Sequence, residues 1–189
     1  EFVTGVQTCA LPISNPFSWQ EVKMIAPEGP YGDVIIVLAY TGLRWGELKA
    51  LRARDVVIDD DGIATALRVR RSASDGFAEK ELSGEKVREV PLMQRPALII
   101  SRRLRGLKPD DAVFAAPWGG PLNLSNMRRS VRWDEISGGR RIQDLHHTAA
   151  YEWLRKGVDV ATVSAWLGHA SVTTTTGAYL HLVNTDEER

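Results

Sequence analysis

The stretch that decides the fold of this 189-residue chain is TGLRWGEL, residues 41–48. The segment before it, residues 31–40, is almost wholly apolar and predicts a helix that is buried on most sides. Thr41-Gly42 supplies the turn that ends this helix. Residues 43–51 are expected to form the next helix, with leucines on its inner face.

Arg44 stands at the mouth of that second helix, among apolar neighbours. A partly buried guanidinium needs a partner, because an unpaired buried charge is costly. The partner is either Glu47, in a structural ion pair, or an anion from outside the chain. Taken alone, the motif favours the pair with Glu47.

Working outward, the remaining segments alternate between helix and strand patterns. Ser18 and Glu21 have the spacing of a capping box, with Phe17 placed to staple a helix that runs to Ala26. Three short segments predict a small antiparallel sheet: 55–58, 63–70 and 87–92. Five later segments predict helices: 96–107, 124–133, 145–156, 160–167 and 172–181. The predicted fold class is α+β, mainly helical, with a three-stranded antiparallel sheet.

Composition fits one globular domain and excludes disordered and collagen-like chains, with 43% hydrophobic and 25% charged residues. The longest apolar run, Val34 to Tyr40, is far shorter than the ~20 residues of a membrane span, which predicts a soluble protein. The formal net charge is zero, but residues 66–141 hold 16 basic and 9 acidic side chains, a net +7. Clustered arginines in this middle third favour a surface that faces phosphates.

The first residues need separate treatment. Val3 to Ser14 reads VTGVQTCALPIS, which is the translation, without a mismatch, of a common short-read sequencing adapter. We therefore expect residues 1–14, including the single cysteine Cys9, to be an artefact outside the fold, with the native protein continuing upstream of Asn15.

The later segments carry the remaining candidates for chemistry. Lys80 and Lys86 flank the turn before the last predicted strand, where a lysine is ordinarily a solvated charge. His146 and His147 open one helix and, being adjacent, point to different faces, which argues against a shared zinc ion. His169 follows the next helix within LGHAS, and Tyr179 lies on the last one.

Taken in order, these motifs resemble the catalytic domain of the tyrosine recombinase (phage integrase) family. The family patterns TGLRxGEL, LxxxDV, RxVPL, LGHxS and TTxxYxHL are matched by residues 41–48, 51–56, 88–92, 167–171 and, with one extra spacer residue, 174–182. Five ordered motifs at family-like spacing make the resemblance specific.

The resemblance implies DNA strand exchange without a metal or other cofactor. Tyr179 would attack a phosphodiester, forming a 3′-phosphotyrosyl link while the 5′-hydroxyl leaves. Arg44 would hold two nonbridging oxygens, and His169 would donate a further hydrogen bond. Lys80 would be the general acid, with Lys86 as the second choice.

The chain departs from the family pattern at the HxLR motif. Gln143 replaces its histidine and His146 replaces its second arginine. Near pH 7 a histidine is mostly neutral and offers one donor where arginine offers a charged, bidentate clamp. Arg141, five residues earlier, is not expected to point the same way. The resemblance therefore predicts a catalytic site at Tyr179, Arg44, His169, Lys80, His146 and Gln143 that is impaired at its second arginine.

The resemblance also implies partners and organisation. The expected partner is double-stranded DNA, contacted through Arg68, Arg70, Lys86, Arg128, Arg129 and Arg141. We expect a catalytic domain over 15–183, a short tail over 184–189, and no N-terminal core-binding domain in this sequence. The chain alone would be a monomer, and the intact family member a tetramer on paired DNA sites. The expected location is the bacterial cytoplasm, at the nucleoid, with no membrane partner.

Two functions of different classes stay open. One is a working or weakly working site-specific recombinase, and the other is a catalytically inactive DNA-binding remnant of one. A histidine-based metal hydrolase is a third and more distant alternative.

Overall fold

The computed structural model describes residues 15–186, with only the backbone described from residue 180 onward. The predicted artefact over residues 1–14 and the end of the predicted tail, residues 187–189, lie outside the described part. Within residues 15–186, no helix combines the length and apolarity needed to cross a bilayer.

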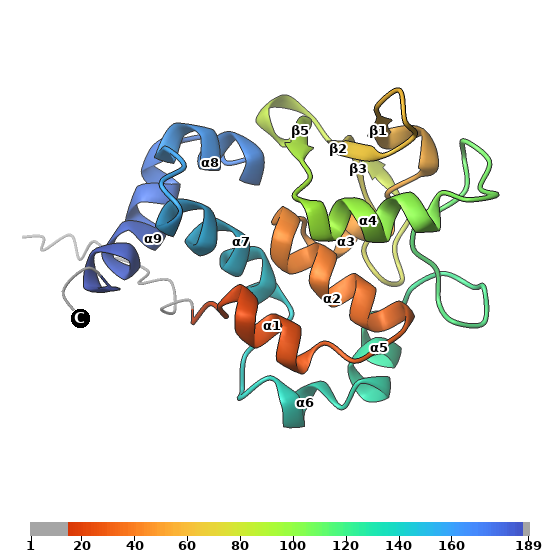
Figure 1. Ribbon diagram of the computed structural model, residues 1–189, viewed down its shortest axis with the longest axis horizontal. Coiled ribbons are helices and arrows are strands. Elements are labelled where there is room, and N and C mark those ends of the chain that lie inside the picture. Colours follow the sequence, from red (N-terminus) through yellow and green to blue (C-terminus); the bar gives the residue numbers. More distant parts are fainter. Residues whose placement is uncertain (1–14, 187–189) are drawn as a thin grey trace, which may run out of the picture.

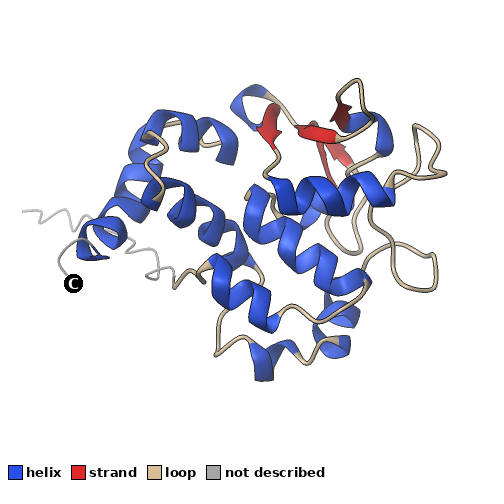
Figure 2. Cartoon of the chain, in the orientation of Figure 1, coloured by secondary structure: helices blue, strands red, loops and turns tan. Residues whose placement is uncertain are grey.

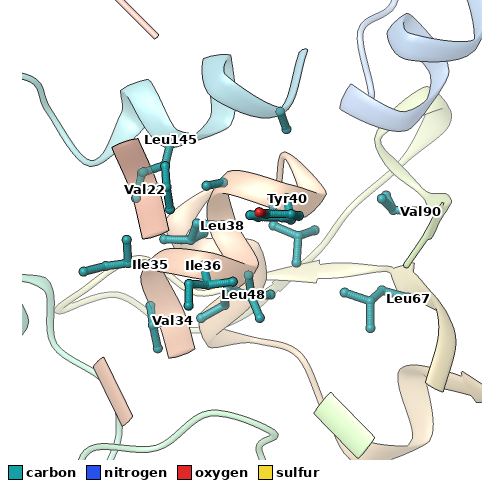
Figure 3. Close-up of a cluster of buried hydrophobic side chains, with 14 of the residues drawn as sticks. Val22, Val34, Ile35, Ile36, Leu38, Tyr40, Leu48, Leu67, Val90 and Leu145 are labelled. Carbon is teal, nitrogen blue, oxygen red and sulfur yellow. The ribbon is translucent and has the colours of Figure 1, made fainter. Parts of the chain in front are cut away.

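The centre of the fold is α2 (Pro30–Thr41), which is buried along nearly its whole length. It contacts α1 (Trp19–Ile25), α4 (Gln94–Arg103) and α7 (Gln143–Arg155), and these helices surround it in Figure 1. Figure 3 shows α2 side chains such as Ile35 and Leu38 within the cluster that also includes Leu145 of α7. The predicted apolar helix is thus confirmed, because a helix that is hydrophobic all round must be covered all round.

The first helix, α1, begins at a local capping signal in the sequence. Ser18 caps α1 with the expected box, since Glu21 N–H donates to the Ser18 hydroxyl and Ser18 N–H donates to the Glu21 carboxylate. The Phe17 backbone N–H donates to the Thr148 hydroxyl on α7 at 2.9 Å. The first helix is therefore fastened to the C-terminal half of the molecule.

The strands are gathered at one side of the molecule, above α4 in Figures 1 and 2. The predicted antiparallel sheet is present with strand order β1-β2-β5, formed by β1 (Val56–Ile58), β2 (Ala64–Val69) and β5 (Arg88–Pro91). A second, two-stranded pair that the sequence analysis did not predict consists of β3 (Arg71–Ser72) and β4 (Lys80–Glu81). Short 3₁₀ turns lie at η1 (Ala53–Asp55) and η2 (Gly84–Lys86).

The C-terminal part is a helical group of α7, α8 (Val160–Leu167) and α9 (Val172–Asp186), which pack on one another at the left of Figure 1. Asp159 caps α8 by accepting from the Thr162 N–H, and Gly168 ends it in the left-handed conformation. The predicted bounds of α8 are confirmed, because both ends carry a local capping signal.

Several predicted helices have other bounds in the structure. The helix expected over 145–156 begins two residues earlier, as α7, and the one expected over 172–181 continues to Asp186, as α9. The single helix expected over 124–133 is wrong, because the chain turns at Arg132, with φ +55°, between α5 (Leu124–Ser130) and α6 (Trp133–Ile136). The segment expected over 96–107 is α4, which begins earlier and ends at Arg103. The segment expected over 43–51 is only the short α3 (Trp45–Lys49).

Candidate active site

Arg44 lies at the N-terminus of α3, where its backbone N–H donates to the Glu47 carboxylate at 2.9 Å. Its guanidinium makes two long contacts, with Nη1 3.4 Å from Glu47 Oε1 and 3.4 Å from the Leu167 carbonyl oxygen. The side chain keeps 37% of its surface exposed. The predicted pair with Glu47 exists, but its geometry leaves most of the Arg44 donors available.

Arg88 of β5 explains why Glu47 does not bind Arg44 more closely. Its Nη1 and Nη2 donate to the two Glu47 carboxylate oxygens at 3.0 and 2.9 Å, and both side chains are almost fully buried. Its Nε donates to the Trp166 carbonyl oxygen of α8 at 2.6 Å. Arg88 thus links the sheet to α3 and to α8. The sequence did not predict this role, although Arg88 belongs to the RxVPL motif.

His146 lies on α7 and is only 2% exposed. Its Nδ1 donates to the carbonyl oxygen of Gly42, the residue that ends α2. Burial, reinforced by Arg44 and His147, lowers the pKa of His146 well below its usual value. The imidazole at the position of the family's second arginine is therefore uncharged near neutral pH.

Gly42 itself is required at this junction. It has φ +64°, and a Cβ added there would lie 2.9 Å from a methyl carbon of Leu167 and 3.3 Å from Ala149 Cβ. The close approach of α2 to α7 and α8 brings the Gly42 carbonyl group to His146.

His169 follows α8, and its Nδ1 lies 2.8 Å from the Thr175 hydroxyl of α9. Burial, with the nearby charge of Arg44, lowers the pKa of His169 to about 4. This ring is also uncharged near pH 7, so it can offer a hydrogen bond but no formal charge.

Tyr179 lies on α9 with 1% of its surface exposed. Its hydroxyl is hydrogen-bonded to Nδ1 of His147, a residue the sequence analysis considered only as a metal ligand. Burial raises the pKa of the Tyr179 phenol above its usual value, Asp144 adds to this effect, and Arg44 opposes it. The one signal for this contact in the sequence was that His147 directly follows the HxLR position, where the chain differs from the family pattern.

The structure brings these residues together from four elements. The His147 ring centroid is 5.5 Å from that of Tyr179 and 5.5 Å from that of His146. The His146 and His169 centroids are 6.1 Å apart. The charge of Arg44 acts on His146, His169 and Tyr179 alike.

The other predicted catalytic residues lie at the surface. Gln143 is exposed at the start of α7. Lys80 is exposed on β4 opposite Ser72, whose hydroxyl abuts Gly46 beside Arg44. Lys86 is also exposed, and its carbonyl oxygen accepts from Arg88 Nη1 at 2.9 Å. Lys80 thus pairs with a strand residue near α3, and Lys86 contacts the arginine that binds Glu47, so these contacts do not decide between the two lysines.

The predicted DNA-binding arginines are exposed: Arg68, Arg70, Arg128, Arg129 and Arg141. Three of them form ion pairs, Arg68 with Glu89, Arg128 with Asp134, and Arg141 with Asp144. For Arg70 and Arg129, no ion pair is present with any described residue.

Other arginines of the basic middle third are structural. Arg71 is buried against Asp55, and both Arg102 and Arg103 bind Asp33. The net charge of this third therefore overstates the number of cations free to meet phosphates.

The turn between β3 and β4 contacts both α3 and the start of α5. Asp75 in this turn binds the Lys49 ammonium group at 2.5 Å and accepts from the Leu124 N–H, at the start of α5, at 2.6 Å. The helix that carries Arg128 and Arg129 thus begins beside the turn that leads to Lys80.

The side chains that the structure describes, those of residues 15–179, form no evident metal site. No three histidine, cysteine, aspartate or glutamate side chains of the described residues are grouped so as to hold an ion. The three histidines around Tyr179 direct their Nδ1 atoms to separate partners.

Comparison with known proteins gives a consistent result. The chain is 28% identical over 182 residues to the tyrosine recombinase XerC of Chlamydia pneumoniae, covering 88% of this chain and 54% of that protein. Its fold is similar to that of the Tn1549 transposon integrase in complex with transposon right-end DNA, with a TM-score of 0.71, 17% identity, and coverage of 94% and 66% of the two chains. The catalytic domain of bacteriophage HP1 integrase gives a TM-score of 0.58 at 16% identity, over 92% of this chain and 90% of that one.

The chain spans about half the length of the curated relatives it matches. The model of the phage integrase family matches residues 30–185, which is most of the sequence. With the fold, the motifs and the family match in agreement, the chain belongs to the phage integrase family of tyrosine recombinases.

Proposed function

We propose that this chain is the catalytic domain of a site-specific DNA recombinase in which Tyr179 is the nucleophile. The observation that carries the proposal is the meeting of Arg44, His146, His169 and Tyr179, from α3, α7, the end of α8 and α9. The family's motifs fall on Arg44, His169 and Tyr179, and His146 stands at the position of the family's second arginine. The solved relative with transposon DNA supports duplex DNA as the substrate.

The proposed reaction forms a bond between Tyr179 Oη and the scissile phosphorus while the bond to the 5′-oxygen breaks. Arg44 would hold two nonbridging oxygens, for which its long contacts leave donors available. His169 would add a neutral hydrogen bond. Lys80, or Lys86 as second choice, would protonate the leaving oxygen.

Burial of Tyr179 has a direct consequence for this reaction. At 1% exposure the hydroxyl cannot reach a phosphate of bound DNA without movement of its surroundings. We infer that DNA binding moves the residues that cover Tyr179 and opens a path from its hydroxyl to the phosphate.

His146 is the reason to expect low activity. The loss of an arginine clamp on a transferring phosphoryl group costs about 10³ to 10⁵ in rate. A buried, neutral imidazole bound to Gly42 supplies no replacement charge. This observation also favours the second candidate, a catalytically inactive domain that only binds DNA.

DNA binding is proposed to depend mainly on exposed arginines. Phosphate contacts by Arg70 and Arg129 would make binding steeply salt-dependent. We further propose a monomer in the absence of DNA and a tetramer on paired sites in the full-length protein.

A suicide DNA substrate that traps covalent protein tests the proposal. We expect a trace of adduct from the natural chain, none from Tyr179→Phe, and about 10³-fold faster formation in His146→Arg. His146→Lys is the matched control, since it adds charge without a bidentate fork and should gain much less.

The candidate recombinase would be overturned by one result. If His146→Arg folds, as circular dichroism can show, yet gives no adduct with Gln143→His added and with the N-terminal region of a relative fused to it, then Tyr179 is not a working nucleophile. The DNA-binding remnant would then be the better function.

A further inference from the structure

The contact between His147 and Tyr179 lies outside the roles assigned above. His147 is on α7 and Tyr179 on α9, 32 residues later, and their side chains meet through Nδ1 and the phenol hydroxyl. The rings are tilted by 47° with centroids 5.5 Å apart. The phenol is buried, so this nitrogen is the group that faces its proton in the described structure.

The protonation state of His147 follows from the groups around it. Burial lowers its pKa, and Arg141, just before α7, and Arg44, at the start of α3, lower it further, while Asp144 acts in the opposite direction. His146, on the same helix, and Tyr179, on α9, face it without a formal charge near neutral pH. The imidazole is therefore neutral at pH 7, and in the tautomer with its proton on Nε2 the lone pair on Nδ1 accepts from the phenol.

The competing bases are already engaged or lack a basic atom. His146 Nδ1 donates to Gly42, and His169 Nδ1 contacts the Thr175 hydroxyl. Gln143 lies one helical turn before His147, on the same face of α7, but an amide cannot take up a proton at neutral pH.

We propose that His147 is the general base that removes the Tyr179 proton during DNA cleavage. This assignment rests on the proposed function. As the bond from Oη to phosphorus forms, the phenol proton moves to His147 Nδ1 and the imidazole becomes an imidazolium. The electron pair of the broken bond stays on the 5′-oxygen, which is protonated by the hairpin lysine. On religation, His147 returns its proton to the phenolic oxygen.

Single-turnover adduct formation in the His146→Arg background tests the assignment. His147→Asn is the informative variant, because asparagine Oδ1 lies where Nδ1 does and can accept the phenol hydrogen bond without taking the proton. We expect the rate in His147→Asn to be reduced by about 10²-fold or more. With His147 the rate should level off above the imidazole pKa, whereas in His147→Asn it should keep rising with pH.

Two controls separate chemistry from folding. Imidazole added in solution should partly restore His147→Ala but leave Thr173→Ala, an exposed position on α9, unchanged. An unchanged rate and pH profile in His147→Asn would overturn the base assignment and leave the recombinase standing. No adduct from the His146→Arg parent, even with Gln143→His added and the N-terminal region of a relative fused to it, would overturn both.

The contact can also be measured without catalysis. Loss of the phenol donor in Tyr179→Phe should raise the His147 pKa by roughly 0.5 to 1, measured by NMR titration of the imidazole, because Nδ1 is freed for protonation. Thr175→Val is the matched control, since it should alter the His169 titration and not that of His147. An identical His147 titration in Tyr179→Phe would mean that the hydrogen bond is absent, which overturns the assignment.

Discussion

The two halves of the candidate site differ in the ionisation of their buried side chains: one half is charged and the other is neutral. The charged half consists of Arg44, Glu47 and Arg88, from α3 and β5. The neutral half consists of His146, His147, His169 and Tyr179, from α7, the end of α8 and α9. Both halves are largely buried, so burial alone does not decide whether a group carries charge.

The difference lies in the residue types. An arginine keeps its proton in a protein, so a buried guanidinium must find a carboxylate, as Arg88 finds Glu47. A histidine escapes the cost of burial by losing its proton, as His146 does. Position 146 therefore decides whether the candidate site carries a second positive charge beside that of Arg44.

Breaking the charged half should produce the largest effect on stability. Arg88→Met leaves the Glu47 carboxylate, 3% exposed, with the Arg44 backbone N–H at 2.9 Å and a guanidinium contact at 3.4 Å, and we expect a loss of about 3 to 5 kcal/mol in unfolding free energy. Urea denaturation measures it. Arg68→Met, whose pair with Glu89 is exposed, should change stability by less than about 1 kcal/mol. Equal losses in both variants would show that the buried pair has no special weight.

A substitution at Gly42, where the two halves of the site meet, should reduce the unfolding free energy somewhat less. Gly42→Ala combines a positive φ with a Cβ 2.9 Å from Leu167, and we expect a loss of about 2 to 4 kcal/mol. Gly62→Ala has a similar φ of +77° but open space around it, so it isolates the backbone contribution of about 1 kcal/mol. The contradicting result is a cost for Gly42→Ala no greater than that for Gly62→Ala.

The smallest expected effect is the pH dependence of the neutral half. The pKa of His146 is lower in the folded than in the unfolded state, so the unfolded chain binds more protons below about pH 6.5 and stability falls as the pH drops. The slope from His146 is at most about 1.4 kcal/mol per pH unit. His146→Asn retains a donor for Gly42 and should flatten the slope measured by urea denaturation between pH 6.5 and 5. A slope unaffected by this substitution would place the titration elsewhere.

Local sequence patterns predicted a helix correctly where the segment carries its own capping residues. Ser18 and Glu21 placed α1, and Asp159 and Gly168 bounded α8, because caps act within one turn of the helix. The pattern was wrong over residues 124–133, where the chain turns at Arg132 against its helical composition. Propensity does not report where packing requires a chain to change direction.

The site was predicted in outline and not in its contacts. The motifs named Arg44, His146, His169 and Tyr179, which the structure brings together. They did not name Arg88 as the main partner of Glu47, or His147 as the partner of Tyr179. These pairs join residues 41 and 32 positions apart, a separation at which sequence spacing carries no information about contact.

The sequence by itself determined which groups this protein has for its chemistry: one arginine in TGLRWGEL, a histidine where a second is expected, and a tyrosine on the last helix. Only the tertiary structure decided their ionisation and their partners. The packing of α7 on α2, with α8 and α9 packed on α7, buries His146 and so removes its charge, while Arg88 binds Glu47 and leaves Arg44 available. The physical reason is that burial and distance between charges exist only once distant segments are folded together.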